Sequence, residues 1–222
     1  MRHFSVELEE LNQLLLQMGG LVESSIHHSI QALSERDKEL AKLVMRDEPR
    51  INQMEVEIDD RTTRLLALNQ PVARDLRFLM ATLKINTDLE RMGDLAVNIA
   101  ERTLALISRP PIKPDIDIPR MASMVEEMLL KCLDAFIKGD ADLAESVLTS
   151  DDGVDSLRDS IYSELVDHMQ RDPTVVPAAI DLLFVARNLE RIADHATNVA
   201  EDVIFLVRGV DVRHHAAQQN KA

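Results

Sequence analysis

The sequence contains one cysteine, no tryptophan and only six glycines, and aromatic residues make up 3% of its 222 positions. The single cysteine, Cys132, cannot build an intramolecular disulfide framework. β-Sandwiches and barrels rely on aromatic and β-branched strands joined by glycine-rich turns, so this composition argues against them. Leu, Ala, Glu, Arg and Met, all good helix formers, dominate instead, and we predict an all-α fold.

Long uncharged apolar runs are also missing, although 45% of the residues are hydrophobic. A transmembrane helix needs about 20 consecutive apolar residues, and the chain has no such run. Glu7, Glu9 and Glu10 interrupt the N-terminus before the apolar core of a signal peptide could form. We therefore expect a soluble protein of the cytoplasm.

Basic residues are scarce relative to acidic ones, and the formal net charge at neutral pH is −14. Binding to nucleic acid or to anionic lipid needs clustered Lys and Arg that release counterions, and no such cluster is present. We therefore predict no nucleic-acid partner and no direct contact with a membrane. Cations and basic protein surfaces suit an acidic protein better.

Four of the eight prolines lie in residues 110–119. Proline lacks a backbone donor and cannot continue a helix, so this segment predicts a linker between two halves. We place one domain at residues 1–109 and a second at residues 120–210. Residues 211–222 are polar and are predicted to form a disordered tail.

The two halves resemble each other. Residues 89–101 recur as residues 189–201 with eight of thirteen positions identical. Earlier positions correspond too, with an offset that drifts from 103 to 100, as for Glu23 with Glu126. Small insertions account for the drift, and the pattern indicates an internal duplication.

Each half is predicted to contain three long helices. Asp37 and Asp140 stand where an N-cap side chain would accept bonds from the next turn, and Pro71 and Pro173 are expected in the first turns of the third helices. Short connections make neighbouring helices antiparallel, giving two up-down bundles in an elongated molecule with helices of about 45 Å. The predicted helices cover about residues 4–35, 37–69, 71–108, 119–138, 140–170 and 173–208.

An acidic stripe follows the third helix of each half. At 100° per residue, Glu90, Asp94, Asn98 and Glu101 fall within an arc of about 80°. Residues 190, 194, 198 and 201 repeat the same residue types. Carboxylates four residues apart repel each other by a few tenths of a kcal/mol, so a repeated stripe suggests a counter-ion.

The second helices supply matching side chains, four residues apart and on one face. Together the two helix pairs offer two candidate metal sites, whose predicted ligands are Glu48, Asn52, Glu90 and Asp94 in the first half and Asp151, Asp155, Glu190 and Asp194 in the second. Carboxylate oxygens favour Mg²⁺, Mn²⁺, iron or Ca²⁺. The same spacing also occurs on ordinary solvated helices, where Arg91 and Arg191 would neutralise the acids, and this interpretation stays open.

Residues 70–77 (QPVARDLR), 88–94 (DLERMGD) and 188–194 (NLERIAD) resemble the signatures of the PhoU family of phosphate-uptake regulators. The resemblance covers nearly the whole chain and implies a twofold three-helix repeat. It also implies iron, zinc, manganese or magnesium at the eight candidate ligands. The implied function is negative control of the Pst phosphate transporter, through its ATPase, and of the PhoR sensor kinase. We expect a homodimer.

Total charge distinguishes the two halves. Residues 1–109 contain 14 basic and 18 acidic residues, a net −4, whereas residues 110–222 contain 11 and 21, a net −10. In addition, the first half has the neutral Asn52 where the second has Asp155. On this count we expect the second site to hold a metal more firmly.

A ferritin-like di-metal oxidase or metal-storage bundle is the alternative function, because it also uses inward carboxylates. Such proteins use Glu-x-x-His on two helices, and the chain has no such motif. His195 lies about 100° around the helix from Asp194 and is expected at the edge of the core. Glycine-rich phosphate loops are also missing. We therefore predict a regulator without enzymatic activity, with a plain helical scaffold as the third possibility.

Overall fold

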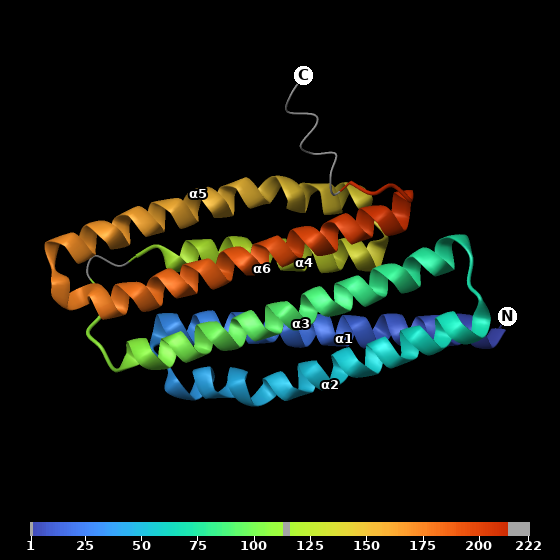
Figure 1. The fold of residues 1–222 in the computed structure, drawn as a ribbon, viewed down its shortest axis with the longest axis horizontal. Coiled ribbons are helices and arrows are strands. Elements are labelled where there is room, and N and C mark those ends of the chain that lie inside the picture. The colour runs from blue at the N-terminus through green and yellow to red at the C-terminus, as the bar shows by residue number, and fades with distance from the viewer. Residues whose placement is uncertain (1, 113–115, 213–222) are drawn as a thin grey trace, which may run out of the picture.

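A computed structural model describes residues 2–112 and 116–212, and this part of the chain folds into long α-helices without strands (Figure 1). The predicted all-α fold is confirmed. Residues 213–222 of the predicted tail lie outside the described residues. The elements are α1 (Arg2–Glu35), α2 (Lys38–Asn69), α3 (Ala73–Ile107), α4 (Ile118–Lys138), α5 (Ala141–Arg171), a short 3₁₀ helix (Pro173–Val175) and α6 (Val176–Arg208).

The second helix of each half begins at the predicted aspartate. The Asp37 carboxylate accepts the backbone N–H of Glu39 at 2.7 Å and that of Leu40 at 3.1 Å. Asp140 does the same at the start of α5, with both distances at 3.0 Å. These bonds satisfy donors that the first helical turn leaves free, so the two N-caps fix where α2 and α5 begin.

The expectation for Pro71 and Pro173 was wrong by a few residues. Gln70, with φ of 47°, ends α2 in the left-handed region, because a residue before proline is disfavoured in the right-handed helical region. Pro71 therefore lies in the connection, and α3 begins at Ala73. In the second half Pro173 opens the 3₁₀ helix, and α6 follows it with Pro177 in its first turn.

Helices α3 and α6 lie side by side along the middle of the elongated molecule (Figure 1). Helices α1 and α2 pack on α3, and α4 and α5 pack on α6. In the view of Figure 1, α2 and α5 lie at the two outer edges, and α1 and α4 lie behind the central pair. Within residues 2–112 and 116–212, no helix is both long enough and apolar enough to cross a membrane.

Ion pairs between the halves give α3 and α6 an antiparallel register. Lys84 Nζ lies 2.7 Å from Asp202 Oδ1 near one end, and Arg102 Nη1 lies 3.5 Å from Asp181 Oδ1 near the other. Arg109 also binds the Asp181 carboxylate. Asp181 and Asp202 are each only 5% exposed, so these partners supply the charge compensation that a buried carboxylate requires.

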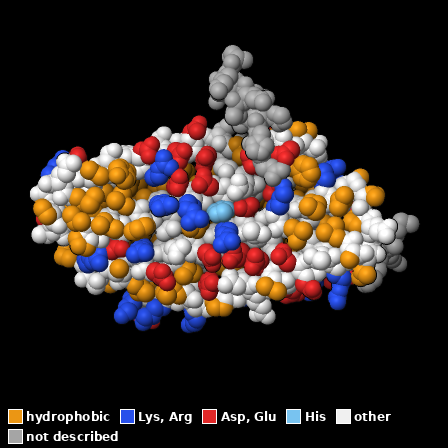
Figure 2. Space-filling view, in the orientation of Figure 1, with side chains coloured by type: hydrophobic (Ala, Val, Ile, Leu, Met, Phe, Trp, Pro, Cys, Tyr) orange, Lys and Arg blue, Asp and Glu red, His pale blue; other side chains and the backbone are white. Residues whose placement is uncertain are grey.

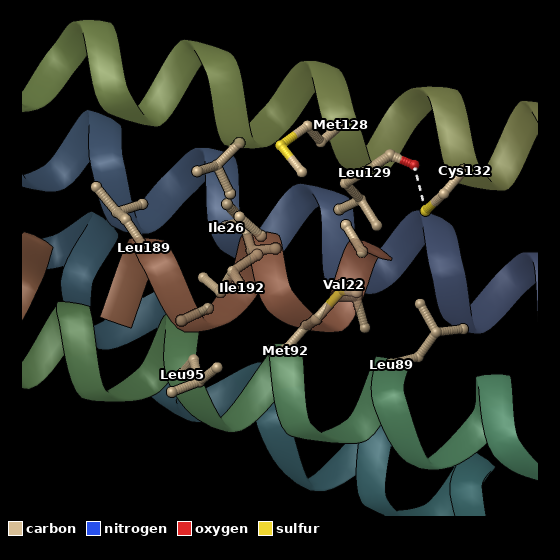
Figure 3. Packing of buried hydrophobic residues seen from close by; sticks show 14 of the residues in the cluster. Val22, Ile26, Leu89, Met92, Leu95, Met128, Leu129, Cys132, Leu189 and Ile192 are labelled. Carbon is tan, nitrogen blue, oxygen red and sulfur yellow. Dashed lines mark hydrogen bonds between the residues drawn. The ribbon is translucent and has the colours of Figure 1, made fainter. Parts of the chain in front are cut away.

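The buried apolar side chains form one continuous core that both halves share. Cys132 belongs to this core, and burial raises the pKa of its thiol to about 12, so it serves packing rather than nucleophilic chemistry. Figure 3 shows side chains from four helices meeting there: Val22 and Ile26 from α1, Leu89, Met92 and Leu95 from α3, Met128, Leu129 and Cys132 from α4, and Leu189 and Ile192 from α6.

Replacing Met92 by alanine tests this shared core. The side chain is fully buried between the halves, so the cavity should lower the free energy of unfolding by about 2 to 5 kcal/mol. Met80→Ala is the matched control, because Met80 is 41% exposed on the same helix. This substitution should lower the free energy of unfolding by less than about 1 kcal/mol. Urea unfolding curves measure both, and equal losses would contradict a core centred on α3.

Candidate metal centres

The structure brings each predicted set of four ligands together where two helices of one half pack. The first acidic cluster lies between α2 and α3 and consists of Glu48, Asn52, Glu90 and Asp94. The second acidic cluster lies between α5 and α6 and consists of Asp151, Asp155, Glu190 and Asp194. Figure 2 shows acidic patches along both flanks of the central helix pair, with basic side chains and a histidine between them.

In the first cluster, neighbouring side chains hold each other in place. Asn52 Nδ2 donates to Glu48 Oε1 at 2.6 Å, which leaves the amide oxygen Oδ1 buried without a hydrogen-bond partner. Arg91 pairs with this cluster from its exposed side: its Nε lies 3.6 Å from Glu90 Oε2, and its side chain is 58% exposed. Arg91 therefore compensates the buried oxygens from the rim of the cluster.

Burial and like charge raise the pKa values of Glu90 and Asp94 in the first cluster. For Glu90 the largest cause is burial, followed by the charges of Asp94 and Glu55, while Arg91 opposes the shift. The pKa of Asp94 is raised by burial and then by Glu48, again against Arg91. A bound cation would relieve this repulsion, because it favours the ionised carboxylates.

An arginine lies inside the second cluster. Arg158 Nη1 is 2.6 Å from Glu190 Oε1 and 3.0 Å from Asp155 Oδ1, so it bridges α5 and α6. Its Nη2 lies 2.9 Å from Asp159 Oδ1. These charge-assisted contacts give the second cluster an internal counter-ion.

Among the carboxyl groups of the second cluster, Asp151 has a raised pKa. Its pKa is raised to about 6 by burial first and then by the charges of Asp194 and Asp155. The pKa of Asp194 is also raised, by burial and then by Glu190 and Asp155, while His195 and Arg158 lower it. Arg158 therefore neutralises part of the cluster and leaves the Asp151 side crowded with negative charge.

The donor types fit a hard or borderline cation, since each cluster offers carboxylates and the first adds an unpaired amide oxygen. Nevertheless, among residues 2–112 and 116–212, no three His, Cys, Asp or Glu side chains lie closely enough together to hold a metal ion as they stand. Binding therefore requires side-chain rotation. The assignment of the eight residues as metal ligands stays a prediction.

The remaining stripe residues serve other purposes or face solvent. Asn98 and Glu101 are exposed on α3, whereas Asn198 Nδ2 donates to Asp88 Oδ1 at 3.3 Å. His195 Nδ1 lies 2.7 Å from the same Asp88 oxygen, and its side chain is 19% exposed. His195 thus lies at the edge of the core, as expected, and joins α6 to α3.

Two residues of the clusters were missed by sequence reasoning, namely Glu55 and Arg158. Burial, Asp59 and Asp94 raise the pKa of Glu55, which places its carboxylate beside the first cluster. Glu55 and Arg158 occupy equivalent positions of the duplication, at the offset of 103 that also relates Glu48 to Asp151. Extending the repeat comparison by one helical turn would have found this opposite-charge pair.

Comparisons with known proteins identify the family. The PhoU domain family matches residues 15–103 and again residues 118–203. The chain belongs to the PhoU family. The phosphate-specific transport system accessory protein PhoU homolog of Pseudomonas aeruginosa is 42% identical over 214 residues, which cover 96% of this chain and 88% of that protein.

Solved PhoU structures share the fold. The crystal structure of PhoU from Pseudomonas aeruginosa superposes with a TM-score of 0.90 at 41% identity, covering 93% of this chain and all of that one. The phosphate transport system regulatory protein PhoU from Streptococcus pneumoniae gives a TM-score of 0.87 at 32% identity, covering 94% of this chain and 99% of that one. The two matched PhoU segments each contain one of the acidic clusters.

Asp151→Asn should stabilise the metal-free protein at pH 7. A carboxyl whose pKa is raised on folding adds stability at low pH, and this stability is lost as pH rises from about 4 through about 6. The neutral amide avoids that loss, so the variant should gain roughly 1 kcal/mol at pH 7 after allowance for solvent screening, and little near pH 4. Thermal melts in EDTA across this pH range measure the difference.

Asp152→Asn is the control for this prediction. Asp152 is the neighbouring exposed residue, and its charge raises the pKa of Asp151 less than burial, Asp194 and Asp155 do, so Asp152→Asn should change the slope of stability against pH much less than Asp151→Asn does. An Asp151→Asn variant that follows the wild-type curve at every pH would contradict the assigned electrostatics.

Proposed function

We propose that the protein is a cytoplasmic negative regulator of phosphate uptake and of phosphate-starvation signalling. It acts through contacts with the ATPase of the Pst transporter and with a PhoR-type sensor kinase, and it binds iron, zinc, manganese or magnesium at its acidic clusters. The supporting observation is the PhoU match in both halves, together with relatives named as accessory proteins of phosphate-specific transport.

The surface supports a role in protein contact. Leu76 and Met80 on α3 are 40% and 41% exposed, and Ile180 and Phe184 on α6 are 43% and 40% exposed. Because α3 and α6 are antiparallel, the two apolar pairs lie at opposite ends of one face, and Figure 2 shows hydrophobic patches at both ends with charged side chains between them. Apolar patches beside charge are typical of docking surfaces.

A carboxylate-bridged oxidase or storage bundle is not favoured. The family match supports an accessory role, and the sequence has no Glu-x-x-His motif. The proposed regulator therefore binds its partners without hydrolysing nucleotide and works as a homodimer. Light scattering after gel filtration measures the oligomeric state independently of partner binding.

Binding to at least one partner should be direct and salt-dependent. Because the chain carries a net charge of −14, association with a basic patch is steered by charge, and ions screen this attraction over about 8 to 10 Å at physiological salt. Affinity for the transporter in detergent or lipid, or for the cytoplasmic part of the kinase, should fall as salt rises. Failure to bind either partner in detergent and in lipid would overturn the proposed function.

Paired substitutions test which face binds. Met80→Ser with Ile180→Ser changes equivalent positions of the two halves on the α3 and α6 face and should weaken partner binding about tenfold. Leu130→Ser is the control, because Leu130 is 47% exposed but lies on α4, behind the central pair. Calorimetric titration measures all three proteins, and an equal loss for the control would contradict the assigned face.

A further inference from the structure

Three positions beside the eight candidate ligands have also diverged between the two halves since the duplication. Equivalent residues of the second helices differ by 103 in number, and those of the third helices differ by 100, as for Glu90 and Glu190. At these offsets the first half has carboxylate or amide side chains, and the second half has neither. The pairs are Glu55 with Arg158, Asp59 with Tyr162, and Asn86 with Ala186.

In the first half these residues extend the set of oxygens around the cluster. Asn86 is fully buried one turn before Glu90, and its Nδ2 donates to Asp59 Oδ1 at 2.8 Å and to the Glu55 carbonyl oxygen at 3.0 Å. Its amide oxygen, like that of Asn52, is buried without a hydrogen-bond partner. A buried oxygen without a donor is costly, and coordination of a cation together with the neighbouring carboxylates would satisfy these two amide oxygens.

In the second half the equivalent positions hold Arg158, Tyr162 and Ala186. The Arg158 guanidinium contacts Glu190 and Asp155 and is 31% exposed, so it lies partly within the cluster rather than at its rim. Tyr162 and Ala186 line a hollow of about 420 Å³ beside it, with apolar neighbours from α6. The guanidinium brings one positive charge between two carboxylates, so it compensates part of their charge and repels a further cation.

The number of carboxylates does not distinguish the clusters. The first has Glu48, Glu90 and Asp94 with Glu55 beside them, and the second has the four carboxylates that define it. The difference is the position of the arginine that pairs with each cluster. Arg91 is 58% exposed, with its Nε at 3.6 Å from Glu90, whereas Arg158 forms ion pairs with carboxylates of both helices of its cluster.

We propose that a divalent cation binds at the first acidic cluster alone, and that the Arg158 guanidinium takes the equivalent place in the second. This assignment rests on the metal binding proposed for the acidic clusters and restricts it to the first of them. It reverses the order expected from the total charge of the halves, because ligand affinity follows the charges within a few ångströms of the site. The ion joins α2 to α3, and the arginine joins α5 to α6.

Mn²⁺ binding by the full chain tests the proposal. After treatment with EDTA and its removal, equilibrium dialysis against Mn²⁺ should give one class of sites. Glu90→Gln with Asp94→Asn should abolish binding, whereas the matched pair Glu190→Gln with Asp194→Asn should leave the Kd nearly unchanged. Glu55→Arg, which gives the first cluster the residue of the second, should weaken binding about tenfold or more.

The reciprocal substitution, at Arg158, should allow the second cluster to bind Mn²⁺. Arg158→Glu should add a second class of Mn²⁺ sites, which Glu190→Gln with Asp194→Asn then removes. Arg158→Gln should also add Mn²⁺ binding at the second cluster, but more weakly. This variant replaces Arg158→Glu in the test if the glutamate variant does not fold. Circular dichroism and thermal melts in EDTA establish the fold of every variant before dialysis.

Three results would overturn the assignment. These are equal Mn²⁺ occupancy of both clusters in the wild type, loss of wild-type binding through the Glu190 and Asp194 pair, and no binding by the wild type at all. The regulatory function is decided separately, because partner binding is measured with the wild type in EDTA and in Mn²⁺. A protein that binds its partner but no Mn²⁺ loses only the cation proposal.

Discussion

Helices α3 and α6 lie antiparallel along the centre of the molecule, and every other long helix packs on one of them. Their contact buries Asp181 and Asp202, whose charges are compensated across the duplication by Arg109, Arg102 and Lys84. Removing a partner from a buried ion pair leaves an uncompensated charge and is strongly destabilising. These pairs therefore fix the register in which the two halves share one core, and that register places both acidic clusters on the flanks of the same face.

Each acidic cluster is a place where helix packing opposes electrostatics. The apolar stripe of α3 has to face the core, and the rotation that satisfies it turns Glu90 and Asp94 towards the acidic side of α2. The same rotation of α6 turns Glu190 and Asp194 towards α5. Raised pKa values in both clusters are the expected consequence, because burial and like charge both favour the protonated form.

The duplication provides two copies of this conflict on nearly the same backbone. The second copy resolves part of it with a counter-ion from the chain itself, the Arg158 guanidinium, and so needs no added ion for its Asp155 and Glu190. The first copy has Glu55 at that position and two buried amide oxygens without donors. Under the proposed assignment, one half responds to cations while the other carries partial compensation in Arg158, which makes the halves different in chemistry despite their common fold.

Local periodicity was sufficient to predict much of the architecture. The helical repeat of 3.6 residues, the N-caps at Asp37 and Asp140, and the recurrence of residues 89–101 as 189–201 are all properties of neighbouring residues in the chain. The same periodicity predicted which acidic residues come together. Side chains four residues apart lie on one face of a helix, so two packed helices can bring their acidic faces into contact. Helix starts at the prolines were less accurate: Gln70 ends α2 in the left-handed region before Pro71, and α3 begins only at Ala73.

The sequence by itself therefore determined the helices, the duplication, the family and the two sets of acidic residues. Only the tertiary structure decided that the halves share one core, that His195 bonds to Asp88 across them, and that Arg158 lies within the second cluster. These features depend on the register of helices that are distant in the chain, which local periodicity does not contain. Total charge favoured the second half for the same reason: it counts charges without their positions, and electrostatic energy depends on distance.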